Sequence, residues 1–341
     1  MGRFVPDVDY ANHFARNRAF RKMTRVLITG AFGQIGTELA AALGARYGPG
    51  NVLATGRGVP DGGPPEGLPF ELLDVTDADA VLQAVRRHRI NVIYHLAAVL
   101  SARGEKDPTM TWRVNMDGLR NVLEAARRAS VSQVFWPSSI AAFGPDTPRD
   151  AVPQDTVMRP TTIYGATKVA GELLCDYYYR RYGLDVRGVR YPGVISSAAP
   201  PGGGTTDYAV EMFHAALERG RYACFVREDC VLPLIYMPDC TRAALGLMDA
   251  EASRLTHRNG FNIAAMTFSA GELAAEIRKH VPGFVCDYEP DERQAIADTW
   301  PRTLDDSAAR TEWDWQPEYD LPRMTADMLA TLRERRRRIA G

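Results

Sequence analysis

The sequence predicts a doubly wound α/β fold: a parallel β-sheet covered by helices on both faces, followed by a smaller C-terminal lobe. Three observations support this prediction. Short apolar runs alternate with helical patterns of roughly ten to twenty residues as far as about residue 190. A glycine-rich turn joins the first apolar run to the first helical pattern. Beyond residue 190 the rhythm changes to loops rich in proline and glycine, such as 198–204.

The elements follow one another in a regular order. Apolar runs predict strands at 25–29, 51–55, 71–75, 91–95, 133–136 and 185–190. Helical patterns between them predict helices at 34–47, 77–88, 110–129 and 161–182. Strands that are apolar throughout are typical of sheets buried on both faces. The lobe is expected to contain helices near 206–219, 239–250, 269–280 and 322–337, and to face the carboxyl ends of the strands.

The chain divides into three expected parts: an N-terminal extension at 1–23, a sheet domain at 24–195, and a lobe at 196–341 from which some segments return to the sheet. The extension has no clear periodicity, so we expect it to lie outside the fold. It carries five basic residues together with Asp7 and Asp9, and transit peptides are poor in acids. We therefore expect a cytoplasmic protein, or a mitochondrial matrix protein if the extension is a transit peptide.

Composition excludes several classes of function. The 41 basic and 42 acidic residues give a formal net charge of -1, so there is no excess of positive charge to bind nucleic acid. No apolar stretch is long enough to span a membrane. The five cysteines include no C-x-x-C pair, which argues against a disulfide framework and a cysteine zinc site. We expect a small-molecule substrate, no metal, and an organic cofactor for any redox chemistry.

The glycine-rich turn has the spacing of a dinucleotide-binding motif. Gly30, Gly33 and Gly36 follow the first strand and open the first helix. Glycines at these positions let the backbone approach a pyrophosphate held at the helix N-terminus. Glycine also serves ordinary tight turns, but the position of this triplet in the first βα unit favours a dinucleotide.

The second strand lacks the acidic residue that would bind the adenosine ribose hydroxyls, because Gly56 and Arg57 stand at its end. An arginine there suits a ribose 2′-phosphate, so NADP is not excluded. The alternative is that Arg57 only begins a solvated loop. Asp74, near the end of the next strand, could bind the adenine amino group; alternatively it caps the following helix.

Tyr164 and Lys168 are four residues apart in a predicted helix, so their side chains share one face. We expect the ammonium to lower the pKa of the phenol, which would make Tyr164 a general base. The chain has 14 tyrosines but only four lysines, so chance rarely produces this pair. Ser139 follows a strand and can hydrogen-bond the substrate oxygen; Ser138 competes for this role, and either serine could instead serve a turn.

These features, together with His95-Leu-Ala-Ala98 and Asn115, resemble the extended short-chain dehydrogenases, a group that includes the sugar-nucleotide epimerases. The stretches 137–145, 162–168, 190–196, 201–216, 293–301 and 304–310 are similar to those of the short-chain L-threonine 3-dehydrogenases. The likeness extends from about residue 25 to about residue 329. It implies a Rossmann-type dinucleotide-binding domain at 24–195 and oxidation of L-threonine to 2-amino-3-oxobutanoate with NAD, without metal.

The resemblance also implies roles for individual residues and a homodimeric enzyme of threonine catabolism. Ser139, Tyr164 and Lys168 would be catalytic. The cofactor would be bound by residues of the glycine turn and of later strand ends: Gly30, Gly33, Gln34, Ile35, Gly36, Asp74, Leu96, Ala97, Ala98, Asn115, Tyr164, Lys168, Tyr191 and Pro192. Members of the group usually have an acid where Gly56 stands, so this chain departs from the pattern at the cofactor's ribose.

Physical arguments also favour a small amino-acid substrate. Thr205 and Thr206 follow three glycines and are expected to begin a helix, where hydroxyls and backbone N–H groups can bind a carboxylate. An ordinary N-cap is the alternative. Ser101 and Ser138 could contact the same substrate. Trp300 could close the pocket around the substrate methyl group, although tryptophan is more often a core residue.

Two other functions remain open at this point. An NADP-dependent reductase or epimerase acting on a sugar nucleotide, or on another 3-hydroxy amino acid, would use the same three catalytic residues. A non-catalytic dinucleotide sensor is the other alternative, and the intact Ser139, Tyr164 and Lys168 set argues against it. A tyrosine-rich stretch at 177–179 could pair with its copy in a dimer; otherwise it packs within the chain.

Overall fold

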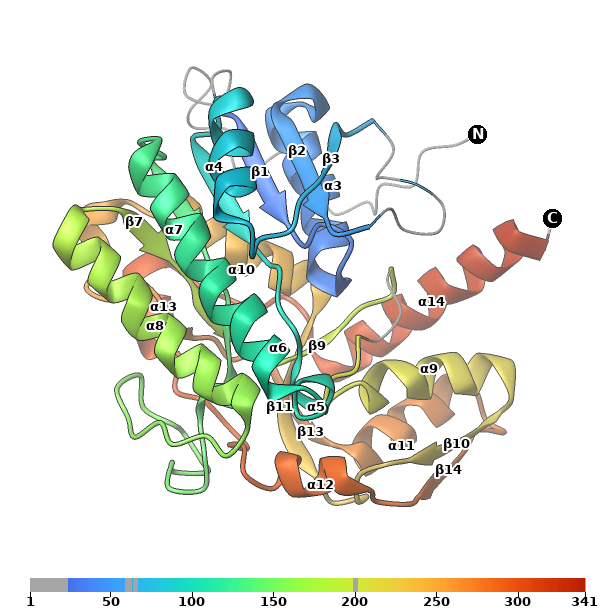
Figure 1. The fold of residues 1–341 in the computed structure, drawn as a ribbon. Helices are drawn as coiled ribbons and strands as arrows, with labels where there is room; N and C mark the ends of the chain where they lie inside the picture. Colours follow the sequence, from blue (N-terminus) through green and yellow to red (C-terminus); the bar gives the residue numbers. More distant parts are fainter. Residues whose placement is uncertain (1–23, 59–62, 64–66, 199–201, 341) are drawn as a thin grey trace.

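Six parallel strands form the centre of the computed structural model, which describes residues 24–58, 63, 67–198 and 202–340 (Figure 1). The order across the sheet is β3-β2-β1-β4-β5-β7, so the direction in which strands are added reverses between β1 and β4. The predicted doubly wound α/β fold is confirmed. The strands are β1 (Val26–Thr29), β2 (Val52–Gly56), β3 (Phe70–Leu72), β4 (Val92–His95), β5 (Gln133–Phe135) and β7 (Asp185–Arg187).

Helices cover both faces of this sheet (Figure 1). They are α3 (Gln34–Tyr47), α4 (Ala78–Arg87), α7 (Gly118–Arg128), α8 (Ile163–Tyr182), α10 (Met237–Asp249) and α13 (Ser307–Trp313). Successive strand residues point to opposite faces. Leu27 and Ile93 pack with α4, α7 and α8, whereas Ile28 and Tyr94 pack with α3, α10 and α13. Burial on both faces explains why the strands are apolar throughout.

Local sequence sets the ends of the helices. The carboxylate of Asp77 accepts a hydrogen bond from the backbone N–H of Ala80 at 3.0 Å and begins α4. The hydroxyl of Thr162 does the same for Gly165 and begins α8. Gly183 ends α8 with a φ of +69°, a left-handed conformation that favours glycine. The predicted helices at 77–88 and 161–182 are therefore present; α4 is one residue shorter at each end, and α8 begins two residues later and ends as predicted.

Three small sheets and several helices lie outside the six-stranded sheet, mostly in the part of the chain expected to form the lobe. One sheet pairs β10 with β14, one has the order β13-β11-β9, and one has the order β12-β8-β6. An apolar cluster around α9 fills the lobe and extends to Tyr164 and Trp300. The strands are β6 (Ser138–Ser139), β8 (Val189–Tyr191), β9 (Gly193–Ile195), β10 (Arg221–Cys224), β11 (Val231–Tyr236), β12 (Phe261–Asn262), β13 (Met266–Ser269) and β14 (Val285–Tyr288). The helices are α9 (Tyr208–Glu218), α11 (Ala270–His280), α12 (Glu292–Ala297) and α14 (Leu321–Ala340).

Two predicted elements of the central domain are interrupted in the structure. The expected strand 185–190 divides at Gly188 into β7 and β8, which belong to different sheets. A Cβ on Gly188 would lie 2.0 Å from the carbonyl oxygen of Trp136, so close backbone contact occurs at the division. The expected helix 110–129 comprises α6 (Pro108–Trp112), the π-helical turn η2 (Arg113–Asp117) and α7. Short elements that were not predicted include α5 (Ser101–Gly104) and the 3-10 turns η1 (Pro49–Asn51), η3 (Ile140–Ala142) and η4 (Ala252–Arg254).

The expected N-terminal extension at 1–23 lies outside the described residues. Within the described part of the chain, none of the helices combines the length and apolar character needed to cross a bilayer.

A partly buried carboxyl group links the first helix to the lobe. Glu38 of α3 accepts a hydrogen bond from the Ser196 hydroxyl at 2.9 Å, directly after β9. Burial raises the pKa of Glu38 to about 7, although the Ser196 hydrogen bond and the charge of Arg335 oppose the rise. The folded chain therefore binds more protons than the unfolded chain between the ordinary pKa of 4.5 and about 7, and stability falls as pH rises through this window.

Replacing Glu38 by glutamine is expected to remove this pH dependence. Relative to the unchanged chain, Glu38→Gln should gain up to about 3 kcal/mol of unfolding free energy near pH 8 and little near pH 5, because glutamine keeps the acceptor but carries no charge. Urea denaturation at both pH values measures the difference. Glu218→Gln, at an exposed carboxylate near the end of α9, is the control. An effect of Glu38→Gln that is equal at both pH values would contradict the prediction.

Candidate active site

The glycine-rich turn lies at the carboxyl end of β1, where the strand order reverses. Gly30 has a φ of +69°, and a Cβ on it would lie 2.8 Å from the backbone nitrogen of Ala97. A Cβ on Gly36 would lie 2.3 Å from the carbonyl oxygen of Gly30. These two glycines allow the turn, α3 and the segment after β4 to pack backbone against backbone. Open α/β sheets bind ligands in the crevice at this position.

Gly33 has a different environment from its two neighbours in the motif. A Cβ on Gly33 would find only the carbonyl oxygen of Gly30 within 4 Å, at 3.4 Å, so the space beside it is open. Gly33 is exposed and precedes α3 without a side-chain cap on the first turn. An uncapped helix N-terminus approached across glycine can bind a pyrophosphate through its N–H groups. The residues present therefore fit a dinucleotide.

Close packing accounts for the glycine at the end of β2. A Cβ on Gly56 would lie 2.9 Å from Cδ2 of the Phe32 ring. That ring packs edge-to-face against Phe70, with 5.1 Å between ring centroids. An acidic side chain at position 56 would therefore have to displace Phe32. The space beside Gly56, where the side chain of the usual acid would begin, is therefore occupied by Phe32, a residue of the glycine-rich turn itself.

Positive charge surrounds Asp74 near the same end of the sheet. Partial burial raises the pKa of this carboxyl, but two hydrogen bonds from Thr76 and the charges of Arg57 and Arg113 outweigh it, so the pKa is lowered. Oδ1 accepts the Thr76 N–H at 2.9 Å and its hydroxyl at 2.8 Å. Asp77, and not Asp74, caps α4. The alternative role considered for Asp74, capping the following helix, therefore belongs to Asp77.

Tyr164 lies in the first turn of α8, and its side chain is 8% exposed. Burial raises the pKa of its phenol to about 12, and a hydrogen bond with Ser139 opposes the rise. The expectation that Lys168 lowers this pKa is wrong for the chain by itself, because burial dominates and only the Ser139 hydrogen bond opposes it. The structure does bring the three residues together. The ammonium of Lys168 lies 5.3 Å from the Tyr164 ring centroid.

Lys168 is buried beside the end of β5. Its Nζ donates a hydrogen bond to the carbonyl oxygen of Pro137 at 2.6 Å and lies 4.6 Å from the ring centroid of Trp136. Burial lowers the pKa of Lys168 to about 8, while Cys175 and Glu172 oppose the change. The ammonium is thus held in place by a carbonyl and an aromatic face.

Asn115 connects the segment after β4 to α8. Its side chain accepts a hydrogen bond from the backbone N–H of Val99 at 2.8 Å and donates to the carbonyl oxygen of Val99 at 3.1 Å. It also donates to the hydroxyl of Thr167 at 3.1 Å, and that hydroxyl donates to the carbonyl of Tyr164. Asn115 lies in the π-helical turn η2, a feature often found at functional sites. Asn115 therefore helps to hold the helix that carries Tyr164.

Sequence reasoning did not find the buried ion pair beside the two serines. Arg190 donates to both carboxylate oxygens of Glu172, at 3.0 and 2.8 Å, and both side chains are less than a tenth exposed. The hydroxyl of Ser138 donates to the same carboxylate at 2.5 Å. Ser138 is therefore engaged with Glu172, whereas the Ser139 hydroxyl accepts the Ala141 N–H at 3.2 Å, which caps η3, and interacts with the Tyr164 phenol. This division favours Ser139 over Ser138 for contact with a substrate.

His95 is a second residue to which the sequence gave no role. Its Nδ1 lies 2.6 Å from the hydroxyl of Thr29, and within the described residues its buried Nε2 has no hydrogen-bond partner. Burial, with a smaller contribution from the charge of Lys168, lowers the pKa of His95 to about 3. The neutral ring thus adds no second positive charge beside Lys168. The sequence signal that could have drawn attention to His95 is the motif that it forms with Leu96 and Ala97.

Two of the proposed substrate residues lie next to each other. The hydroxyl of Thr205 lies 3.1 Å from that of Ser101, and both residues are buried. The expected helix start at Thr205 and Thr206 is wrong, because α9 begins at Tyr208. Asp207 precedes it and accepts the N–H groups of Gly203 and Gly204, each at 2.8 Å. These N–H groups are therefore bonded within the chain, which leaves the threonine and serine hydroxyls as the polar groups for a carboxylate.

The other predicted residues lie around the same crevice with their side chains partly in the core. Trp300 packs in the apolar cluster that contains Tyr164. The hydroxyl of Tyr191 donates to the carbonyl oxygen of Cys240, so its side chain points into the core beneath the sheet. The amide of Gln34 donates to the carbonyl oxygen of Val194. The remaining positions are buried or partly buried: Ile35, Leu96, Ala98 and Pro192.

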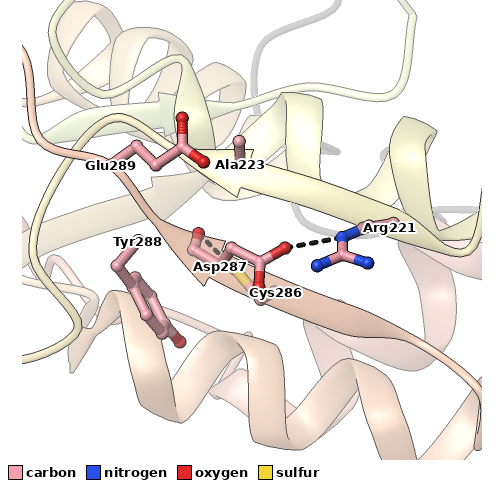
Figure 2. A pocket seen from close by; sticks show the side chains of 6 residues that line it. All are labelled: Arg221, Ala223, Cys286, Asp287, Tyr288 and Glu289. Atoms are coloured by element: carbon pink, nitrogen blue, oxygen red, sulfur yellow. Dashed lines mark hydrogen bonds and ion pairs between the residues drawn. The ribbon is translucent and has the colours of Figure 1, made fainter.

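A separate hollow of about 590 Å³ lies in the lobe beside the pair β10 and β14 (Figure 2). Figure 2 shows Arg221 paired with Asp287, at 2.7 Å, on one side of this hollow. None of the residues predicted from sequence lines it. We therefore place the candidate active site at the carboxyl ends of β1 and β4 and not at this hollow.

Comparisons with known proteins identify similar sequences and structures. Residues 26–264 match the NAD dependent epimerase/dehydratase family. An uncharacterized epimerase/dehydratase of Staphylococcus haemolyticus is 48% identical over 92% of this chain and 99% of its own length. The structure of a GalE-like L-threonine dehydrogenase from Cupriavidus necator is 54% identical, with a TM-score of 0.88 over 90% of this chain and 99% of that one. A monomeric L-threonine 3-dehydrogenase from a metagenome is 47% identical, with a TM-score of 0.87 over 91% and 99%.

Proposed function

This chain belongs to the NAD dependent epimerase/dehydratase family, and on that premise we propose that it oxidises the 3-hydroxyl of L-threonine to 2-amino-3-oxobutanoate. The observation that carries the proposal is the group of Ser139, Tyr164 and Lys168 beside a glycine-rich turn. Similarity to solved L-threonine dehydrogenases at 47–54% identity supports the choice of substrate. The epimerase alternative uses the same three residues, but no described feature favours it.

Tyr164 is proposed as the general base. Its phenolate would take the proton of the substrate hydroxyl while the Ser139 hydroxyl donates a hydrogen bond to the same oxygen. A bound nicotinamide dinucleotide would supply the hydride acceptor and a positive charge that favours the phenolate. Lys168, held by Pro137 and Trp136, adds a second fixed positive charge. Preorganised charge and orientation would therefore supply most of the rate enhancement.

The cofactor is expected to lie along the crevice defined by the glycine-rich turn. Gly30, Gly33 and Gly36 would admit its pyrophosphate, and the hydrogen bonds of Asn115 would keep the segment after β4 in place. The group is a nicotinamide dinucleotide, and the end of β2 bears on the choice between NAD and NADP.

A direct assay tests the proposed function. Purified protein is incubated with L-threonine and either NAD or NADP, and absorbance of the reduced nicotinamide is followed. We expect turnover with L-threonine and less with L-serine and other 3-hydroxy amino acids. Conversion of a sugar nucleotide without turnover of threonine would establish the alternative and overturn the proposal.

Thr205 is proposed to bind the substrate carboxylate together with Ser101. Replacing Thr205 by valine keeps the volume but removes the hydroxyl, so KM for threonine is expected to rise roughly five- to ten-fold, with a smaller change in kcat. Initial-rate kinetics measures both constants. Thr109→Val, at an exposed position of α6, is the matched control. A KM equal to that of the control would exclude Thr205 from the substrate site.

The homodimer and the role in threonine catabolism are also part of the proposal. Helix α8 exposes Leu173, Tyr177 and Tyr182, at 64%, 51% and 43%, which would suit an interface with a second copy. One similar protein is described as monomeric, so assembly is not a requirement for this activity in that relative.

A further inference from the structure

We propose that the end of β2 forms a subsite for a ribose 2′-phosphate, built from Gly56, Arg57 and Phe32, so that this chain binds NADP in preference to NAD. The inference rests on the proposed function, because it assumes that the crevice holds a nicotinamide dinucleotide. It concerns the end of the cofactor opposite to the reacting ring, and so it is tested separately from catalysis.

The end of β2 lacks the acidic residue that would contact the adenosine ribose. In dinucleotide-binding folds of this type, a carboxylate at the end of the second strand accepts hydrogen bonds from the 2′- and 3′-hydroxyls and repels a 2′-phosphate. Gly56 occupies this end of β2 and offers neither effect. Compared with a site that has the acid, NAD would lose two hydrogen bonds at its ribose here, and NADP would be spared a repulsion between like charges.

Packing around Gly56 also opposes an acidic side chain at this position. The Phe32 ring lies where a side chain on residue 56 would begin, with Cδ2 and Cε2 at 2.9 and 3.0 Å from the hypothetical Cβ. Phe70 supports the ring from the other side. Phe32 belongs to the turn that would hold the pyrophosphate. Its ring therefore connects the proposed pyrophosphate site with the proposed ribose site at the end of β2.

A positive charge takes the place of the acid. Arg57 directly follows Gly56, is exposed, and has no ion pair within the described part of the chain. A guanidinium binds a phosphate through paired, charge-assisted hydrogen bonds. Arg113 adds a second positive charge near the single carboxylate of Asp74. The local balance is therefore positive at the point where a 2′-phosphate would be located.

Fragments of the cofactor test the subsite without turnover. Isothermal titration calorimetry with 2′,5′-ADP and with 5′-AMP isolates the contribution of the 2′-phosphate. We expect 2′,5′-ADP to bind about ten-fold more tightly or better, since charge-assisted hydrogen bonds are the strongest class. Arg57→Ala should remove most of this difference. Arg128→Ala, at an exposed arginine that ends α7, should preserve it.

Several outcomes would overturn the inference. The first is equal or tighter binding of 5′-AMP by the unchanged protein, and the second is an Arg57→Ala variant that keeps the full preference for 2′,5′-ADP. The double variant Phe32→Ala with Gly56→Asp makes room for an acid and should reverse the preference; if it still prefers 2′,5′-ADP, the assignment also fails. Tight binding of NADH without binding of NADPH would refute this subsite but leave the proposed function intact. Failure to bind either dinucleotide would refute the proposed function.

Discussion

Replacing Tyr164 by phenylalanine is expected to lower kcat for threonine oxidation by about 10²–10⁴-fold, the usual contribution of a positioned general base. The substitution removes one oxygen from a residue that is 8% exposed, so the packing of α8 should change little. Binding of the dinucleotide should be preserved, because the glycine-rich turn is untouched. Steady-state kinetics together with a fluorescence titration of the reduced cofactor measures both effects.

A second tyrosine on the same helix provides the control. Tyr178 is also buried, and its hydroxyl donates to Glu124 at 2.7 Å, away from Ser139 and Lys168. Tyr178→Phe should therefore reduce stability modestly, by about 1 kcal/mol, without changing kcat. Loss of activity in both variants to the same degree would indicate a structural effect and contradict the assignment of Tyr164.

The two pKa values of the site also give a pH dependence. The phenol of Tyr164 must lose its proton to act as a base, and its pKa of about 12 in the free chain means that activity rises as pH increases. Lys168 must keep its proton, and its pKa of about 8 sets the pH above which activity should level off or decline. In Tyr164→Phe the rising limb should disappear.

Features that depend on neighbours in the sequence were predictable. The triplet of Gly30, Gly33 and Gly36 follows from a strand-turn-helix order, and the shared face of Tyr164 and Lys168 follows from a spacing of four residues in a helix. The strands that precede the glycine triplet and Ser139 are parallel, so these groups follow strands that end at the same edge of the sheet.

Features that depend on burial or on distant contacts were not predictable. The direction of the Tyr164 pKa shift was wrong, because Tyr164 is buried in an apolar cluster that also contains residues distant in the sequence, such as Trp300. The start of α9 was misplaced because Asp207, and not a threonine, bonds the preceding backbone N–H groups. No local pattern marks the pairing of Glu172 with Arg190. The two residues are 18 positions apart, Glu172 on helix α8 and Arg190 on strand β8.

This buried ion pair is expected to be the most sensitive point of the fold near the site. Arg190 is held by Glu172, by the carbonyl of Gln154 and by the side-chain oxygen of Asn262. Removing one partner leaves the other charge buried and unpaired, which typically costs about 3–5 kcal/mol. Arg190→Ala should therefore lose about this much unfolding free energy in urea. Arg159→Ala, which breaks an exposed pair with Asp146, should lose less than about 1 kcal/mol.

The same pair positions the catalytic group, so its loss should also affect the reaction. Glu172 lies one turn after Lys168 on α8 and accepts the hydroxyl of Ser138, the neighbour of Ser139. Ser138→Ala removes only that hydrogen bond and should lower kcat several-fold while KM stays nearly constant, because Ser139 is displaced and the substrate carboxylate site is not. Arg190→Lys should not restore stability, since an ammonium cannot form the paired hydrogen bonds of the guanidinium. If Arg190→Ala proves no less stable than Arg159→Ala, then the pair does not anchor α8, and the position of Lys168 must depend on Pro137 and Trp136 alone.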